Sequence, residues 1–424
     1  MLKGKKGGVI RKFLKVLGPG LITGASDDDP SGIATYSQAG AQYGLSTLWT
    51  ALITFPLMAA IQEMCARIGL ATSHGLTSLL KQHYPRWVLY VMLLFSFPAI
   101  IMNIGADIAG MGAVSNLIFP QVRAELFSIG FTALLLVFII YFPYRKIASV
   151  LKYLAMVLLV YLIVPFLTHT NWLQVLKATV IPHISFDKDY LGILVAILGT
   201  TISPYLFFWQ TNMEVEELEE KGAKLKKVIV PSRRMYHDMR EDVNIGMLFS
   251  NVVMFFIILT TGSVLATNGT HKIDTVEQAA QALKPLAGNG AYYLFAIGII
   301  GTGLLAIPVL GGTLSYIFSE TFGLQMGLNK KFHEAKGFYI IMAISLVAGL
   351  LMNYIGISPV KALLYSAILY GVTAPVIIAI ILHICNNKAI MGGHANGKRA
   401  NVLGVATLVL MTVAALALLY FQFF

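Results

Sequence analysis

Apolar residues in this chain gather into long runs separated by shorter polar stretches. Windows of about 19 residues separate eleven such runs, each suited to a helix that crosses a hydrocarbon core about 30 Å thick. The runs cover residues 13–40, 45–69, 87–118, 126–143, 150–168, 190–211, 244–267, 290–320, 338–355, 359–385 and 401–422. This pattern predicts an all-α polytopic membrane protein with eleven transmembrane helices in a lipid bilayer.

The composition excludes an ordinary soluble protein. Of the 424 residues, 57% are hydrophobic and 12% are charged, whereas soluble proteins have about 25% charged residues. The basic residues behind the net charge of +11 indicate which loops lie inside. If the N-terminus is inside, 24 of the 31 basic residues fall in inner segments and 6 in outer ones. We therefore expect a multi-pass protein of the plasma (inner) membrane with a cytoplasmic N-terminus, an outside C-terminus and no nucleic-acid partner.

The first apolar run contains three consecutive aspartates near its middle. Asp27, Asp28 and Asp29 are followed by Pro30 and then by Gly32. Each carboxylate at this depth costs about 2.5 to 3.5 kcal/mol on insertion scales, which indicates a functional role. Because proline lacks an amide hydrogen, we expect the helix to break here and to free backbone carbonyls. Carboxylates and carbonyls are oxygen donors, so the break is a candidate site for a hard cation.

The sixth apolar run is interrupted in a similar way. Pro204 lies near its middle, 174 residues after Pro30. Paired interruptions in two oppositely oriented halves indicate a transporter of inverted repeats with a site at the membrane midplane. The expected parts are a first five-helix repeat over residues 1–169, a second, inverted repeat over residues 170–385, and an inner loop with the eleventh helix over residues 386–424.

A third polar feature lies in the third apolar run, where Asn103 and Asp107 are four residues apart on one helix face. An aspartate inside a membrane is a candidate functional residue by default. Two interpretations of Asp107 stay open: a group on the coupling or access path of an ion, and a structural hydrogen-bond partner. Glu63 and Arg67 have the same spacing near the end of their run, where we expect a gate or a structural ion pair.

Several short motifs in the chain resemble the Nramp family of divalent metal transporters. They are Gly18-Pro19-Gly20, Asp29-Pro30, the run from Gln38 to Gly44, and Ala66-Arg67-Ile68-Gly69. The resemblance extends over the first ten runs. It implies a LeuT-like fold of two inverted five-helix repeats, with the ion held between the unwound parts of helices one and six.

The family's motifs on helices one and three are present in altered form. The usual Asp-Pro-Gly-Asn appears here as Asp29-Pro30-Ser31-Gly32. The resemblance therefore maps the metal-binding aspartate onto Asp29 and replaces the ligand asparagine by Gly32. The family's aspartate and glutamate on the third helix map to Ile104 and Asp107.

The sixth-helix motif departs further. The family's Ala-x-x-Met-Pro-His appears as the six residues from Thr200 to Tyr205, so Ser203 replaces the thioether ligand and Tyr205 replaces the histidine linked to proton movement. A tenth-helix glutamine maps to Ala367. These changes enlarge the site and leave oxygen donors, which resembles the Nramp-related magnesium transporter branch. The candidate metal-binding residues are Asp29, Asp28, Ser203, Thr200, Ser31, Gly32 and Tyr205, with Asp107 and Asn103 on the coupling or access path.

The predicted function is import of Mg²⁺, with Mn²⁺ also carried, by alternating access in a monomer. The metal ion is the substrate, and no cofactor is expected. Because Tyr205 does not titrate near neutral pH, we expect transport without proton coupling. A proton-coupled importer of Mn²⁺ or Fe²⁺ and a Na⁺-driven symporter of an organic solute stay open as alternatives. An enzyme or a channel is the alternative from a different functional class. The sequence has no nucleophile-base constellation, HExxH motif, CxxC motif or phosphate loop, so no enzyme is expected.

Overall fold

The computed structural model describes residues 18–142, 156–168, 170–226, 229–267, 269 and 272–423. Within these ranges the chain forms helices and no β-strand. The basic N-terminal segment that contributed to the predicted orientation lies outside them, as do the basic residues of the loop after the fourth run and the expected repeat boundary at residue 169.

The first half of the described chain is a series of helices of very different lengths. They are α2 (Pro19–Asp27), α3 (Pro30–Tyr43), α4 (Trp49–Thr72), α5 (Leu76–His83), α6 (Arg86–Ile118), α7 (Ala124–Tyr141), the 3-10 helix η1 (Met156–Leu162), α9 (Val164–Leu167) and α10 (Trp172–Val180).

The second half continues in the same manner. It comprises α11 (Lys188–Thr201), α12 (Pro204–Leu225), α13 (Arg233–Thr261), the π-helix η2 (Gly262–Ala266), α14 (Val276–Ala280), η3 (Gln281–Leu283), α15 (Lys284–Ala287), η4 (Gly288–Gly290), α16 (Ala291–Phe322), α17 (Lys336–Met352), η5 (Asn353–Ile355), α18 (Pro359–Asn386), α19 (Lys388–Met391), η6 (Gly392–His394) and α20 (Lys398–Phe423).

The helices agree with the predicted apolar runs. Among the described residues, eight helical segments are long and apolar enough to cross a membrane, and two shorter apolar helices cover Met156–Leu167 and Lys336–Met352. The first run is divided between α2 and α3, each too short to span alone, because about 20 helical residues are needed. The described part of every predicted run is therefore largely helical.

Both predicted breaks are present, and each second half begins on a proline. α2 ends at Asp27 and α3 begins at Pro30, while α11 ends at Thr201 and α12 begins at Pro204. Proline loses no hydrogen bond at the first position of a helix, because the amide there has no intrahelical acceptor. The prolines thus start a new helix at low cost and prevent the preceding one from continuing.

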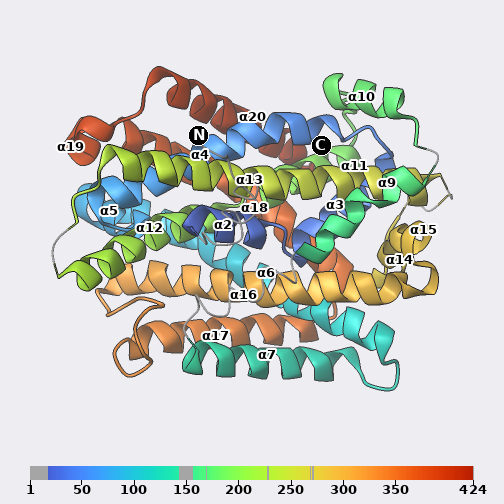
Figure 1. The fold of residues 1–424 in the computed structure, drawn as a ribbon, viewed down its shortest axis with the longest axis horizontal. Helices are drawn as coiled ribbons and strands as arrows, with labels where there is room; N and C mark the ends of the chain where they lie inside the picture. The colour runs from blue at the N-terminus through green and yellow to red at the C-terminus, as the bar shows by residue number, and fades with distance from the viewer. Residues whose placement is uncertain are drawn as a thin grey trace, which may run out of the picture.

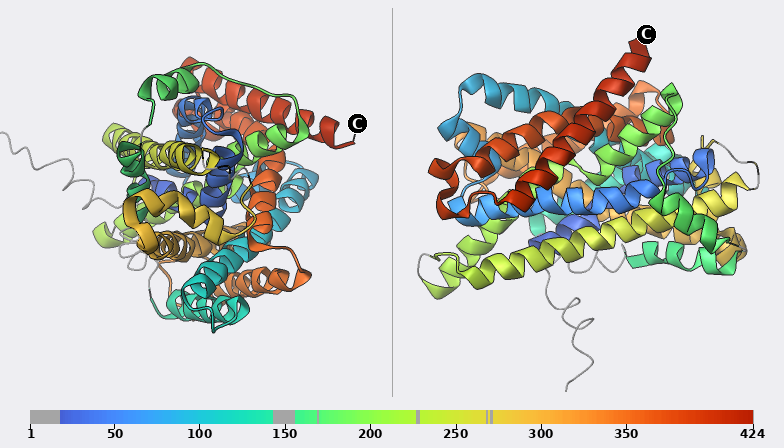
Figure 2. Two further views of the ribbon diagram at one scale, coloured as in Figure 1. Left: turned by 90° about the vertical axis from the view of Figure 1, so that its right-hand side faces the viewer. Right: turned by 90° about the horizontal axis from the view of Figure 1, so that it is seen from above.

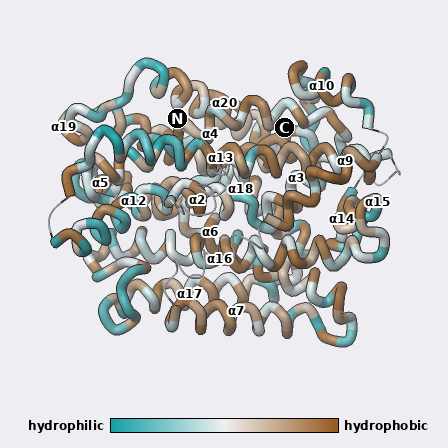
Figure 3. Tube along the Cα trace, viewed as in Figure 1, coloured by the Kyte–Doolittle hydropathy of each residue, from teal (hydrophilic) through white to brown (hydrophobic). Residues whose placement is uncertain are grey.

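The broken helices occupy the middle of the molecule. Long helices run roughly alongside one another, with α7 and α17 on one side and α20 on the opposite side (Figures 1 and 2). The apolar window of the α11 and α12 segment is 94% buried, whereas those of α20 and α7 are 33% and 22% buried. Figure 3 shows hydrophilic residues concentrated toward the ends of the helices. α7 and α20 therefore present apolar side chains outward, as lipid-facing helices do.

Glycines bring the half-helices close to their neighbours. A Cβ on Gly24 of α2 would lie 2.1 Å from the carbonyl oxygen of Gly246 on α13, and a Cβ on Gly246 would lie 2.1 Å from that of Gly20. A Cβ on Gly199 of α11 would lie 2.2 Å from the carbonyl oxygen of Ala367 on α18. Backbone meets backbone at both crossings, so α2 and α11 are positioned directly by the unbroken helices.

Candidate metal site between the broken helices

Asp29 lies at the first break and caps the N-terminus of α3. Its Oδ1 accepts hydrogen bonds from the backbone amide of Gly32 at 2.8 Å and from the hydroxyl of Ser31 at 2.6 Å. The positive end of the helix dipole favours a carboxylate at this position. Its Oδ2 accepts from Nδ2 of Asn103 at 2.8 Å. Three donors therefore fix the orientation of one carboxylate that is 1% exposed.

Asn103 connects this carboxylate to two other helices. While its amide nitrogen donates to Asp29, its Oδ1 accepts from the hydroxyl of Ser366 on α18 at 2.9 Å. The side chain is completely buried. The sequence predicts that Asn103 lies on the coupling or access path, and the structure brings it into direct contact with Asp29. Ser366 has no sequence signal of its own, because single serines are common in apolar helices.

Asp27 and Asp28 share one hydroxyl donor. Ser250 on α13 donates to Oδ2 of Asp27 at 2.6 Å and lies 3.3 Å from Oδ1 of Asp28. A serine has a single proton to donate, so it satisfies one carboxylate at a time. Oδ1 of Asp27 and Oδ2 of Asp28 are buried and have no hydrogen-bond partner. Sequence reasoning missed Ser250, which lies in an apolar run distant from the aspartates along the chain.

Asp107 is one turn beyond Asn103 on α6. Both of its carboxylate oxygens are buried without a hydrogen-bond partner. Together with the three aspartates of the first break, it makes four buried carboxylates, and the buried charged residues of the described chain include no lysine or arginine. Buried charge needs compensation, so this arrangement calls for cations or protons.

The second break contributes three hydroxyl groups, one bonded locally and two bonded to the first broken helix. Ser203 donates to the carbonyl of Thr200 at 2.5 Å. Tyr205 extends to the first break and donates to the carbonyl of Ser26 at 3.0 Å, and its ring lies 5.5 Å from that of Tyr370. Thr201, which sequence reasoning did not select, lies 3.0 Å from the hydroxyl of Tyr36. These contacts join the two breaks directly.

The predicted metal ligands therefore have different roles in this structure. Asp29 and Asp28 present carboxylates at the first break, whereas Ser31 and Gly32 donate to Asp29. Oγ1 of Thr200 would lie 3.3 Å from a Cβ on Gly32. This contact places Thr200 against the first break, where an asparagine side chain would have to stand if position 32 carried one.

The site is closed on both sides. Toward the end that carries most basic loops, Thr23 donates to Oε1 of Gln210 at 2.5 Å, and Gln210 donates to Oε1 of Glu214 at 3.0 Å. Toward the other end, Oε1 of Gln38 accepts from the amide of Ile273 at 2.9 Å. A void of about 10 Å³ beside this contact is lined by apolar residues and glycine, which leaves room for one water at most. The four carboxylates of the site are at most 1% exposed, so the site is occluded in this structure.

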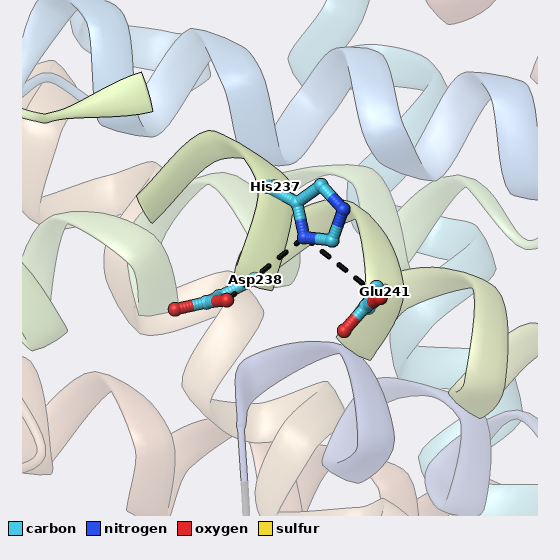
Figure 4. Close-up of side chains that lie close together, drawn as sticks. All are labelled: His237, Asp238 and Glu241. Carbon is cyan, nitrogen blue, oxygen red and sulfur yellow. Dashed lines mark ion pairs between the residues drawn. The ribbon is translucent and has the colours of Figure 1, made fainter. Parts of the chain in front are cut away.

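A second group of ligand-type side chains lies on the surface. It consists of His237, Asp238 and Glu241, which lie close together on α13 (Figure 4). Nδ1 of His237 is 4.0 Å from Oδ1 of Asp238 and 3.8 Å from Oε1 of Glu241. Their side chains are 64 to 68% exposed. Exposed groups of this kind are common on charged helix faces, and the cluster belongs to the solvated charged segment at the start of α13.

Glu63 and Arg67 form no ion pair with each other in this structure. Glu63 instead accepts from Arg240 on α13 at 2.8 Å, and Arg67 donates to Oδ1 of Asn396 at 2.5 Å. Their shared helix face predicts a gate or a structural ion pair, and the structure gives each of them a partner distant in sequence, from α13 and from the loop before α20. Tertiary packing decides the pairing of both side chains.

Known proteins are similar to this chain over most of its length. The sequence matches the family described as natural resistance-associated macrophage protein-like, Nramp, over residues 20–421. A relative from Caldanaerobacter subterraneus subsp. tengcongensis, named divalent metal cation transporter MntH, is 24% identical and aligned over 93% of this chain and 90% of its own.

Solved structures resemble the fold over almost its whole length. The Eremococcus coleocola manganese transporter in complex with an aromatic bis-isothiourea compound has a TM-score of 0.75 at 18% identity, covering 98% of this chain and 88% of its own. MhsT in complex with L-phenylalanine has a TM-score of 0.61 at 10% identity, covering 95% and 98%. The predicted LeuT-like fold is confirmed, and because the family match covers nearly the whole sequence, the chain belongs to the Nramp family of membrane transporters and is not an enzyme.

Proposed function

We propose that this protein transports divalent metal cations, with Mg²⁺ as the preferred substrate and Mn²⁺ also carried. The observation that carries the proposal is the group of four buried carboxylates, with no buried lysine or arginine in the described chain. A divalent cation supplies the missing positive charge. The names of the relatives, divalent metal cation transporter and manganese transporter, support the same class of substrate.

The preference for Mg²⁺ rests on the chemistry of the donors. Carboxylates, hydroxyls and freed carbonyls are oxygen ligands, and Ser203 has a hydroxyl where the family resemblance places a thioether. Oxygen donors suit Mg²⁺ and Mn²⁺, whereas a thioether favours softer ions. Mg²⁺ also retains several waters, and the unpartnered oxygens of Asp28 and Asp107 would accept hydrogen bonds from them.

Transport by alternating access requires the two closures to open in turn. The bond between Thr23 and Gln210 must break to open one side, and the bond between Gln38 and Ile273 must break to open the other. With the basic loops in the cytoplasm, an inside-negative membrane potential drives the ion inward by about 2.3 kcal/mol per charge per 100 mV. This drive supports import into the cytoplasm across the plasma membrane without a second ion. We propose in addition that the transporter acts as a monomer.

Uptake of Mg²⁺ into proteoliposomes tests the site. Asp29→Ala removes a carboxylate held by three donors, and uptake should fall to the level of protein-free liposomes. The matched control is Asp274→Ala, which removes an exposed carboxylate 3.5 Å from Lys272, and its uptake should equal that of the unmodified protein. Undiminished uptake by Asp29→Ala would overturn the assignment.

Proton-coupled import of Mn²⁺ or Fe²⁺ is the second candidate, and Asp107 is the observation that favours it. Both oxygens of this buried carboxylate lack a partner, so it is available to accept a proton. Tyr205 supports the uncoupled mechanism, because its hydroxyl is engaged with Ser26 and a phenol ordinarily titrates near pH 10.

A pH-sensitive dye inside the same liposomes separates the two mechanisms. Uncoupled transport predicts Mg²⁺ uptake with no acidification of the lumen. Acidification that accompanies metal uptake, and that is lost in Asp107→Asn, would establish coupling instead.

A further inference from the structure

A cavity of about 580 Å³ opens between α4, α13 and the start of α20, away from the candidate metal site. The views in Figure 2 show α20 crossing α4 while α13 runs beside α4, and the contacts between these helices agree. α20 is the eleventh membrane segment, and only 33% of its apolar window is buried. The cavity therefore lies where a lipid-facing helix meets the transporter body.

One end of this cavity is strongly basic. Arg67, Arg240, Lys398 and Arg399 line it, and Glu63 is its single acidic residue. Glu63 is already engaged by Arg240 at 2.8 Å. The cavity thus has an excess of three positive charges at this end, enough to attract an anion of one or two charges.

Hydrogen-bond donors at the basic end are available. Nε of Arg67 is buried without a partner while its Nη2 is held by Asn396. Within the described residues, neither Lys398 nor Arg399 has a side-chain hydrogen bond or ion pair. Both residues belong to the first turn of α20, whose amides and dipole also favour an anion.

The other end of the cavity is apolar. Phe55, Pro56, Ala59 and Ala60 of α4 line it together with Leu403 of α20. From Phe55 to Arg67 the helix rises by about 18 Å, taking 1.5 Å per residue. A soluble anion such as inorganic phosphate would use the basic end and leave this apolar wall without a partner.

We propose that the cavity binds one anionic phospholipid from the leaflet on the side of the basic loops. The phosphodiester lies against Arg67, Lys398 and Arg399, and an acyl chain lies along the apolar wall of α4. Basic pockets between membrane helices bind anionic headgroups in this way. The lipid would join α20 to α4 and α13, and this inference does not depend on the metal that the protein transports.

Native mass spectrometry of the detergent-solubilised full chain tests the proposal with phosphatidylglycerol as the probe. The unmodified protein should retain one phosphatidylglycerol and no phosphatidylcholine. Lys398→Gln with Arg399→Gln should weaken retention about 25-fold, because each basic residue at a membrane surface contributes about a factor of five. The control Arg233→Gln with Arg234→Gln removes the same charge from the start of α13, outside the cavity, and should retain the lipid.

Ala60→Phe distinguishes a lipid from a free anion. It fills the apolar wall and leaves the basic end intact, so retention of phosphatidylglycerol should fall while binding of inorganic phosphate is unchanged. Equal retention by the unmodified protein and the Lys398 and Arg399 double variant would overturn the proposal. So would full displacement of the lipid by millimolar inorganic phosphate.

Discussion

At the level of single residues, Asp29 is the aspartate of the first break that is held by the most hydrogen-bond donors. The sequence predicted its importance from its depth and from the proline that follows. The partners that orient it were only partly predictable: Ser31 and Gly32 are adjacent, and Asn103 was recognised as a polar group on a helix face. Ser250, which serves the other two aspartates, could not be found, because a hydroxyl 222 residues away acquires its role only through packing.

Asn103→Ala should weaken metal binding without removing a carboxylate. The substitution leaves Oδ2 of Asp29 without its donor, and loss of such a supporting partner typically costs 10- to 100-fold in metal affinity. The Mg²⁺ concentration for half-maximal uptake should therefore rise about 10- to 100-fold.

Asn116→Ala is the control for this measurement. It removes an amide on the same helix that donates to the carbonyl of Val122 at 2.8 Å. Equal concentration dependence in Asn103→Ala and Asn116→Ala would show that Asn103 plays no part in holding the ion.

At the scale of elements, the breaks were predictable and the helix crossings were not. Pro30 and Pro204 predict chain breaks because they act on their own backbone. The contact of Gly24 with Gly246 depends on how α2 lies against α13, and nothing in the local sequence reports that approach. The ion pair of Glu63 with Arg240 on α13 was not predictable for the same reason, since the local spacing predicts only a gate or an ion pair near the end of α4.

Gly246→Ala should open the side of the protein that bears the basic loops. The added methyl would lie 2.1 Å from the carbonyl of Gly20, and overpacking of this kind costs about 1–3 kcal/mol. The strain acts against the closed position of α2, so a cysteine introduced at Leu21, which is 7% exposed, should react with a thiol reagent at least about fivefold faster.

Gly130→Ala is the matched control, since nothing lies within 4 Å of the added methyl. The background reaction should be low because the two native cysteines, Cys65 and Cys385, are buried. An unchanged rate in Gly246→Ala would mean that α2 does not move away from α13 during opening.

At the scale of the whole molecule, charge is segregated by depth. In the predicted topology the basic residues concentrate in the inner loops, and in the described residues four aspartates lie buried without a buried lysine or arginine. The all-helical membrane class was predictable from hydropathy, because membrane insertion depends on it, and the LeuT-like fold was predictable only from the resemblance of the motifs to the family. The occluded state was not, since it depends on contacts between distant segments such as Gln38 and Ile273.

The predicted orientation can be tested by cysteine labelling in whole cells. Glu277 and Glu334 are both exposed, on opposite sides of the predicted membrane. A membrane-impermeant maleimide should label Glu277→Cys in intact cells and Glu334→Cys only after lysis. The reverse pattern would place the basic loops outside and would invert the direction of the proposed transport.

We expect the carboxylates between the broken helices to bind Mg²⁺ in preference to softer ions. Calorimetric titration of the purified protein measures this preference directly. We predict that Mg²⁺ binds, that it displaces Mn²⁺, that Cd²⁺ binds more weakly, and that Asp29→Asn abolishes the heat of binding. Tight binding of Cd²⁺ with no competition from Mg²⁺ would contradict it.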